Sequence, residues 1–192
     1  GLTIGVTLSE DEYGAFAEEA QKFCRRLPQE KAKPQRYSFD VRAKNEGILS
    51  SSRVQYVGKA ANFLRLGFSY TGSMSVLETI LRYDYFWTKI RVQGGAYGAF
   101  TQISRVGTLF FSSYRDPNLK ETLDVFDKTS DYLASFDVSD REMVKFIIGT
   151  ISTLDVPLTP QLKGSVAQDR FFRQLTDADR QKTRDEILAT RQ

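Results

Sequence analysis

The sequence predicts an α+β domain in which an antiparallel or mixed sheet packs against helices. Segments with alternating apolar residues, typical of strands, occur between segments whose apolar residues recur at helical spacing. The two clearest strands, residues 99–103 and 108–114, are separated by only four residues. Such a connection suits an antiparallel hairpin and is too short for the crossover between parallel strands. The strands are also too few for a doubly wound parallel sheet.

The first part of the chain is expected to form a strand and then a helix. Apolar residues alternate over residues 2–8, as in a strand. Ser9 and Glu12 have the spacing of a capping box, which begins a helix, and Pro28 stops the helical pattern. The opening residues lack the charged and apolar regions of a signal peptide, and we expect the chain to be a piece of a longer protein.

The middle of the chain is expected to hold a second strand and a long helix. The strand region runs from about residue 48 to residue 56, and residues 56–62 continue it toward a turn. Gly72 and Ser73 open the helix. Its apolar face is formed by Val76, Leu77, Ile80, Leu81, Trp87 and Ile90.

The residues after the hairpin are expected to be helical. Asp116 and Pro117 begin a helix with proline at its first position, and apolar residues at helical spacing carry it as far as Phe136. Ser139 and Glu142 form a second capping box, which heads another helix. The highly charged tail, residues 168–192, completes the helical part.

The composition is that of one globular domain. The 192 residues are 41% hydrophobic and 27% charged, which is enough for a core of its own. The net charge of +3 is too small to predict a nucleic-acid or membrane partner, and no apolar run approaches the roughly 20 residues that span a bilayer. We therefore expect a single domain over residues 1–192, with no nucleic acid and no membrane among its partners.

The absence of histidine excludes several kinds of active site. Without histidine, the chain cannot form a Ser-His or Cys-His nucleophile pair or a histidine-based zinc or iron site. The lone Cys24 cannot form an internal disulfide or a thiolate cluster, and it favours a reducing, intracellular setting. Magnesium sites made of carboxylates, Ser-Lys chemistry and paired-carboxylate chemistry remain, but no spacing indicates any of them.

The stretch RVQGGAYG, residues 91–98, admits three interpretations. A phosphate-binding loop requires glycines between a strand and the following helix, whereas these glycines follow a helix, so we reject nucleotide binding. Gly94 and Gly95 are alternatively a left-handed cap that merely ends the helix. The third interpretation is that Arg91 and Tyr97 are paired donors for a carbonyl or carboxylate.

The partner of Arg91 stays open at this point. Helical spacing places Arg91 on the apolar side of its helix, near Asp84 and Thr88, where a buried cation needs a partner. Tyr97, six positions later, begins the following strand. The residues alone do not decide between pairing with Asp84 and binding a substrate.

The stretch YDYFWTKIRVQGGAYGAF resembles the C-terminal half of pitrilysin/insulinase-type zinc peptidases, specifically the presequence protease subfamily. The resemblance covers the chain from about residue 2 to residue 190. Four further stretches support it in order along the chain, namely VQYVGKAANF, FFSSYRDPNLKETLDVFD, MVKFIIGTISTLDVPLTPQLKG and RQKTRDEILAT.

The resemblance implies a clamshell enzyme of two halves, each built from two similar α+β domains of the LuxS/insulinase-like type. In such metallopeptidases the first domain holds zinc through an inverted H-x-x-E-H motif and a distant Glu. Residues 1–192 would then be the C-terminal, fourth domain. By the same resemblance, Arg91 and Tyr97 are catalytic residues that bind the substrate carbonyl and stabilise the oxyanion, and Gly94, Gly95 and Ala96 contact the substrate.

This chain departs from the whole-enzyme pattern because it has no H-x-x-E-H motif. We expect it to contain no metal ligands and to cleave no peptide alone. Zn²⁺ would belong to the full-length enzyme, held by the N-terminal half of the same polypeptide, and peptides would be the substrates. The resemblance also implies a cytoplasmic location in a bacterium, or the mitochondrial matrix or a plastid in a eukaryote.

The alternative is a non-catalytic peptide-binding or interaction subunit of the same fold. Processing-peptidase partners and respiratory-complex core proteins are of this kind and have lost the zinc motif. The retained pair Arg91 and Tyr97 favours the enzyme, because a decayed subunit need not keep it.

Overall fold

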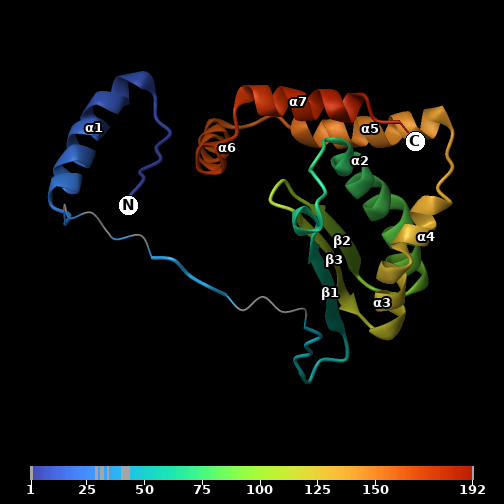
Figure 1. The fold of residues 1–192 in the computed structure, drawn as a ribbon. Helices are drawn as coiled ribbons and strands as arrows, with labels where there is room; N and C mark the ends of the chain where they lie inside the picture. The colour runs from blue at the N-terminus through green and yellow to red at the C-terminus, as the bar shows by residue number, and fades with distance from the viewer. Residues whose placement is uncertain (1, 29, 31–32, 34, 40–43, 192) are drawn as a thin grey trace. The chain divides into compact units, whose positions relative to one another are not determined.

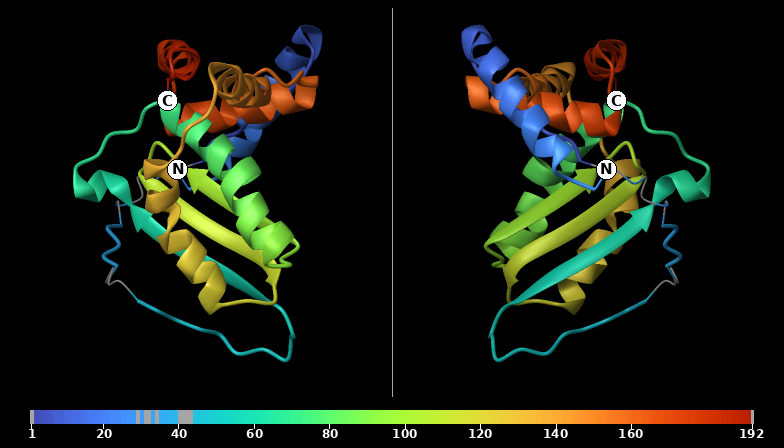
Figure 2. Two further views of the ribbon diagram at one scale, coloured as in Figure 1. Left: turned by 90° about the vertical axis from the view of Figure 1, so that its right-hand side faces the viewer. Right: turned by 90° about the vertical axis from the view of Figure 1, so that its left-hand side faces the viewer.

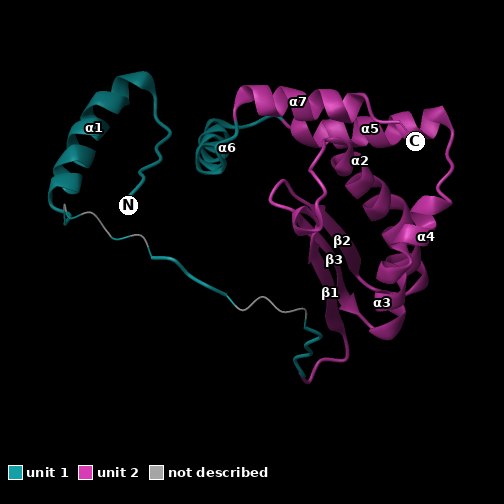
Figure 3. Ribbon diagram, viewed as in Figure 1, with its two compact units in different colours: residues 1–49, 157–175 teal, residues 50–156, 176–192 magenta. Residues whose placement is uncertain are grey.

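The computed structural model describes residues 2–28, 30, 33, 35–39 and 44–191 (Figure 1). It consists of two compact units (Figure 3). Unit 1 comprises residues 1–49 and 157–175, and unit 2 comprises residues 50–156 and 176–192. Compact units within a chain are not by themselves separate domains, so the single domain over residues 1–192 stays a prediction.

Unit 2 is built on a three-stranded antiparallel sheet, which confirms the α+β class. The strands are β1 (Gln55–Asn62), β2 (Gly98–Ile103) and β3 (Thr108–Asp116), and they lie in the order β1-β3-β2. β2 and β3 form the predicted hairpin. Its turn requires glycine at residue 107, where φ is +87° and a Cβ would collide with the side chain of Asn62.

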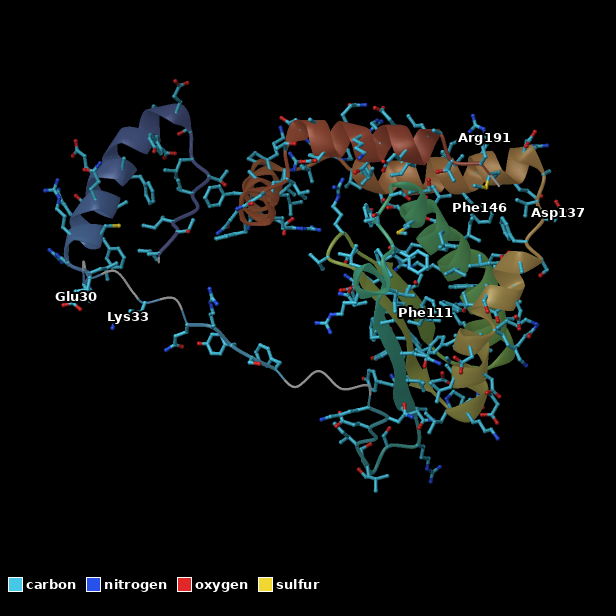
Figure 4. The ribbon with its side chains drawn as sticks, in the orientation of Figure 1. Glu30, Lys33, Phe111, Asp137, Phe146 and Arg191 are labelled. Atoms are coloured by element: carbon cyan, nitrogen blue, oxygen red, sulfur yellow. The ribbon has the colours of Figure 1, made fainter. Side chains whose placement is uncertain are left out.

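Helices of unit 2 cover one face of this sheet (Figure 2). The first, α2 (Ser73–Ile80), continues as two π-helical segments, η2 (Leu81–Tyr85) and η3 (Trp87–Gln93). Next to it lie α3 (Lys120–Asp127) and α4 (Thr129–Ala134). Sheet and helices enclose a cluster of buried side chains that includes Phe111, labelled in Figure 4. The cluster consists of Val57, Leu81, Tyr85, Phe86, Ile90, Ala96, Phe111 and Phe126.

A second cluster joins three helices of unit 2. α5 (Asp140–Leu154) and α7 (Asp177–Leu188) pack with α2. The capping box of Ser139 and Glu142 at the start of α5 is confirmed. The buried members of this second cluster are Val76, Ile80, Met143, Ile147 and Ile187, with Phe146 beside them (Figure 4).

Unit 1 contains α1 (Glu10–Arg25) and α6 (Pro160–Arg173). The capping box at the start of α1 is confirmed, but the strand predicted over residues 2–8 is wrong. That segment has no partner strand and runs against α6, where a Cβ on Gly164 would collide with the side chain of Thr7. No described residue of unit 1 is buried.

Three further boundaries differ from the predictions. β1 begins only at Gln55, because residues 48–54 have no partner in the sheet. β3 continues through Asp116, so the helix predicted at Asp116 and Pro117 begins instead at Lys120, and a break at Lys128 divides it into α3 and α4. The charged tail is likewise two helices.

Two short features connect elements of the fold. Gln174, in a left-handed conformation with φ of 52°, separates α6 from α7. A 3-10 turn, η1 (Phe63–Leu66), follows β1. Among the described residues, no helix combines the length and apolar character that crossing a membrane requires.

Candidate functional site

In the turn between η3 and β2, each hydrogen bond spans one residue more, from donor to acceptor, than the corresponding bond at a common helix end. The N–H of Gly95 donates to the carbonyl of Arg91 at 3.0 Å, and the N–H of Ala96 donates to the carbonyl of Ile90 at 3.1 Å. In the Schellman motif of an α-helix these two bonds span three and five residues, and here they span four and six. The widening follows from the π-helical bonding of η3.

Both glycines of this turn are required, for different reasons. Gly95 has a φ of +78°, a left-handed conformation that favours glycine, and this confirms the predicted cap. Gly94 has an ordinary φ, but a Cβ there would lie 2.6 Å from the carbonyl oxygen of Ile90. The turn therefore presents mostly backbone on this side of the molecule.

Arg91 joins the two ends of the turn. Its Nε donates to the carbonyl of Tyr97 at 3.0 Å, and its guanidinium stacks over the ring of Trp87, 4.0 Å from the ring centroid. The pairing with Asp84 that helical spacing left open is not formed, because Asp84 accepts a hydrogen bond from the Tyr132 hydroxyl at 2.7 Å. No described carboxylate forms an ion pair with Arg91.

Tyr97 presents its hydroxyl to solvent. Its N–H donates to the carbonyl of Tyr114 at 3.0 Å, which extends the β2–β3 pairing by one residue. Its ring lies edge-to-face on Tyr114, and Tyr114 lies edge-to-face on Tyr56, with centroid distances of 5.6 and 5.2 Å. Tyr97 is 68% exposed, and its hydroxyl makes no hydrogen bond with the part of the chain that the structure describes.

A buried network behind the turn fixes its position. The carboxylate of Asp116, fully buried, accepts from the N–H of Asn118 at 2.9 Å and from the Thr122 hydroxyl at 2.7 Å. The side-chain amide of Asn118 donates to the carbonyl of Gly94 at 2.6 Å. The sequence predicts Asp116 as the start of a helix, which is wrong, since it is the buried last residue of β3. The Asp-Pro-Asn order at residues 116–118, typical of a turn, was the available signal.

The turn borders an open pocket of about 590 Å³. The predicted site residues Arg91, Gly95, Ala96 and Tyr97 line it together, while Gly94 lies behind them, bonded to Asn118. The other lining residues are Val54, Val92 and Arg115. The pocket therefore brings together two guanidinium groups, a phenol and exposed backbone, and none of the lining side chains is a carboxylate.

The site offers hydrogen-bond donors rather than metal ligands. Within the described ranges, no three His, Cys, Asp or Glu side chains are grouped so that they could hold a metal ion. Arg91 and Tyr97 are both donors toward a carbonyl or carboxylate oxygen. The arrangement suits binding of an oxygen atom that carries or develops negative charge.

A family model described as the PreP C-terminal domain matches residues 45–192 of this chain. The chain belongs to the presequence protease family. The resemblance noted in the sequence is thereby confirmed, and the site residues 91–97 lie inside the matched range.

Three relatives are similar to this chain, and two of them are named as presequence proteases. Protein HypA of Clostridium perfringens is 40% identical over 187 residues, which cover 97% of this chain and 19% of that protein. Presequence protease 1, chloroplastic/mitochondrial, of Arabidopsis thaliana is 41% identical over 148 residues, or 77% of this chain and 14% of the relative. Presequence protease, mitochondrial, of Emericella nidulans is 32% identical over 164 residues, which cover 85% of this chain and 15% of that protein. The chain thus spans less than a fifth of the length of these relatives.

Proposed function

We propose that this chain supplies the substrate side of the active site of a zinc metalloendopeptidase that degrades unstructured peptides. The observation that carries the proposal is the convergence of Arg91 and Tyr97 on one open pocket, in a member of the presequence protease family. In this proposal both residues bind the carbonyl of the scissile peptide bond and stabilise the oxyanion that forms from it.

The contacts of Arg91 support its proposed role in binding the substrate carbonyl. Its Nε is engaged with the Tyr97 carbonyl and its face is stacked on Trp87, so the side chain is oriented before a substrate arrives. The terminal N–H groups remain for a substrate oxygen. The Tyr97 hydroxyl, whose ring is supported by Tyr114, adds a second donor. Preorganised donors of this kind stabilise developing charge without reorganising during the reaction.

The short side chains of the turn support close approach of a peptide. Gly95 and Ala96 line the pocket, and their only side chain is the methyl group of Ala96. Gly94 lies behind them. An extended substrate backbone could therefore approach the turn closely. We assign Gly94, Gly95 and Ala96 to substrate binding on this basis.

The zinc belongs to another part of the polypeptide in this proposal. The donors at this site do not form a metal-binding set, and the whole chain lacks histidine. Zinc bound by the N-terminal half would supply an activated water, and the present chain, as the fourth domain, would supply the oxyanion donors. The proposed location is the cytoplasm in a bacterium, or the mitochondrial matrix or a plastid in a eukaryote, and the names of the plant and fungal relatives include mitochondrion and chloroplast.

Substitution of the two donors in the full-length enzyme tests the proposal. Tyr97→Phe removes one hydroxyl and almost no volume, and we expect kcat to fall by about 10²–10³-fold, or roughly 3–4 kcal/mol. Arg91→Ala should be at least as severe, because it removes a charge and a positioning group. Steady-state kinetics normalised to bound zinc and to folded protein measure both effects.

Zinc content provides the control, since neither residue is proposed as a ligand and both variants should bind zinc like the wild type. Near-wild-type turnover in Tyr97→Phe would remove Tyr97 from the mechanism. Full activity in both variants would favour the alternative, a non-catalytic peptide-binding or interaction role of this domain.

A further inference from the structure

The backbone at Arg115 is strained beside the pocket. Its φ is 48°, in the left-handed region that residues other than glycine, asparagine and aspartate rarely adopt. Among the described residues of the strands, Arg115 is the one non-glycine residue in that conformation. A conformation of this kind persists where the surrounding structure imposes it, and it is frequent at functional sites.

A β-bulge imposes the conformation. Val57 on β1 pairs with Ser113 on β3, but Gln55 pairs with Asp116, so two residues of β3 lie opposite a single residue of β1. The two residues are Tyr114 and Arg115. A left-handed position favours glycine, and here an arginine, the second residue of the bulge, occupies it.

The bulge determines which side chains point into the core. Regular alternation after the buried Ser113 would turn Arg115 toward the helices. The extra residue instead buries Asp116, where it organises the network behind the turn, and leaves Arg115 exposed. Arg115 consequently lines the same pocket as Arg91 and Tyr97.

The guanidinium of Arg115 has no ion-pair or hydrogen-bond partner within the part of the chain that the structure describes, so no such contact explains an arginine beside the pocket. No described side chain or backbone group forms an ion pair or hydrogen bond with its guanidinium. No carboxylate lines the pocket, so Arg91 and Arg115 both add positive potential to it. Arg91 is already oriented by Tyr97 and Trp87, whereas the fork of Arg115 is free. A planar guanidinium fork matches a carboxylate through two parallel hydrogen bonds.

We propose that Arg115 is a specificity residue that binds a carboxylate of the peptide substrate, beside the carbonyl-binding pair Arg91 and Tyr97. The carboxylate is either an acidic side chain near the scissile bond or the free C-terminus of the peptide. This inference rests on the proposed function, since it assumes that the pocket receives a peptide.

Matched peptides cleaved by the full-length zinc enzyme test the inference. The parent is an unstructured, Gln-containing peptide with an amidated C-terminus. One set of derivatives replaces single Gln residues by Glu on either side of the cleaved bond, and another restores the free C-terminal carboxylate. The kcat/KM of each derivative is divided by that of the parent. The Kd of each derivative, measured by fluorescence anisotropy, is compared with the Kd of the parent in the same way, and this second comparison does not depend on turnover.

We expect one of the carboxylate-bearing peptides to be favoured by about 10-fold in the wild type, the range of a hydrogen bond to a charged group. Arg115→Asn removes the charge with a residue that tolerates the left-handed conformation, and it should reduce the ratio to about 1. Arg115→Lys keeps a cation without the fork and should give an intermediate ratio. The derivative whose kcat/KM advantage over the parent is lost in Arg115→Asn shows which carboxylate Arg115 binds, an acidic side chain or the free C-terminus.

The controls separate this inference from the proposed function. Arg65→Gln removes an exposed charge just beyond the opposite end of β1 and should leave the ratio unchanged. Tyr97→Phe should slow cleavage of all peptides alike without changing the ratio. A wild-type enzyme with no carboxylate preference in kcat/KM or Kd, or an Arg115→Asn variant that keeps the preference and melts like the wild type, would overturn the role of Arg115 alone.

Discussion

Gly95 and Gly94 form the turn that holds the candidate site, and a side chain at either position is unfavourable. Ala at residue 95 would have to adopt a φ near +78°, and Ala at residue 94 would press on the carbonyl of Ile90. We expect each Gly→Ala variant to lower the free energy of unfolding by about 1–2 kcal/mol. Urea unfolding of the chain measures the change.

A glycine in a helix of the same unit provides the matched control. Gly149 lies inside α5, and a Cβ there would make an ordinary contact of 3.8 Å with Thr79. Gly149→Ala should therefore stabilise the protein by roughly 0.5–1 kcal/mol, since alanine favours the helix. Equal effects at residues 95 and 149 would contradict the assignment of the turn.

At the scale of single residues, the sequence singled out Arg91 and Tyr97, which line one pocket, and missed the residues that surround them. Arg91 and Tyr97 stand out because the RVQGGAYG stretch resembles a known family. The sequence predicts Asp116 as the start of a helix and does not single out Arg115, because alternation along a strand cannot reveal an extra residue. One bulge shifts the face of every later residue, and only the pairing with β1 shows where it lies.

At the scale of elements, Glu78 links α2 to the edge of the sheet. Its carboxylate accepts from the N–H of Ile103, on β2, at 3.2 Å. Burial raises the pKa of Glu78, although the bond from Ile103 and the charge of Arg82 act in the opposite direction. The folded protein therefore holds this proton more tightly than the unfolded chain does.

This pKa predicts a pH dependence of stability. The contribution of Glu78 is most favourable below its ordinary value of 4.5 and is lost as the pH rises through the raised pKa. Glu78→Gln keeps an acceptor for Ile103 and cannot ionise. We expect the melting temperature of the variant, relative to the wild type, to rise between about pH 4 and pH 7. A difference that falls over this range would mean that ionised Glu78 stabilises the fold.

Helix starts marked by a capping box were predictable from sequence, whereas the start at Asp116 and Pro117, the isolated strand and the helix type were not. The capping boxes at Ser9 and Ser139 are both present, since their geometry is local to a few residues. Residues 2–8 alternate like a strand but have no partner to pair with. The π-helical bonding of η2 and η3 also escaped prediction, because an apolar face at helical spacing is compatible with both kinds of helix.

At the scale of the whole molecule, the buried residues among those that the structure describes all lie in unit 2. Both core clusters lie there, and no described residue of unit 1 is buried. We expect one cooperative thermal transition that reports on unit 2, and strong hydrogen-exchange protection only within residues 50–156 and 176–192. Circular dichroism melting and exchange mass spectrometry measure these two properties. A melt without cooperativity, or equal protection in α1 and α5, would contradict this distribution of stability.

The path of the chain through unit 2 has a consequence for the order in which the molecule is made. The chain leaves the unit after residue 156 and returns at residue 176, and Ile187 on α7 is fully buried against α2 and α5. A nascent chain grows from its N-terminus, and domains generally fold as units during synthesis. The sheet and the cluster around Phe86 can form once residues 50–136 have emerged from the ribosome. The second cluster must wait for α7, so α2 and α5 expose an apolar groove to chaperones and to neighbouring nascent chains until residue 187 has emerged.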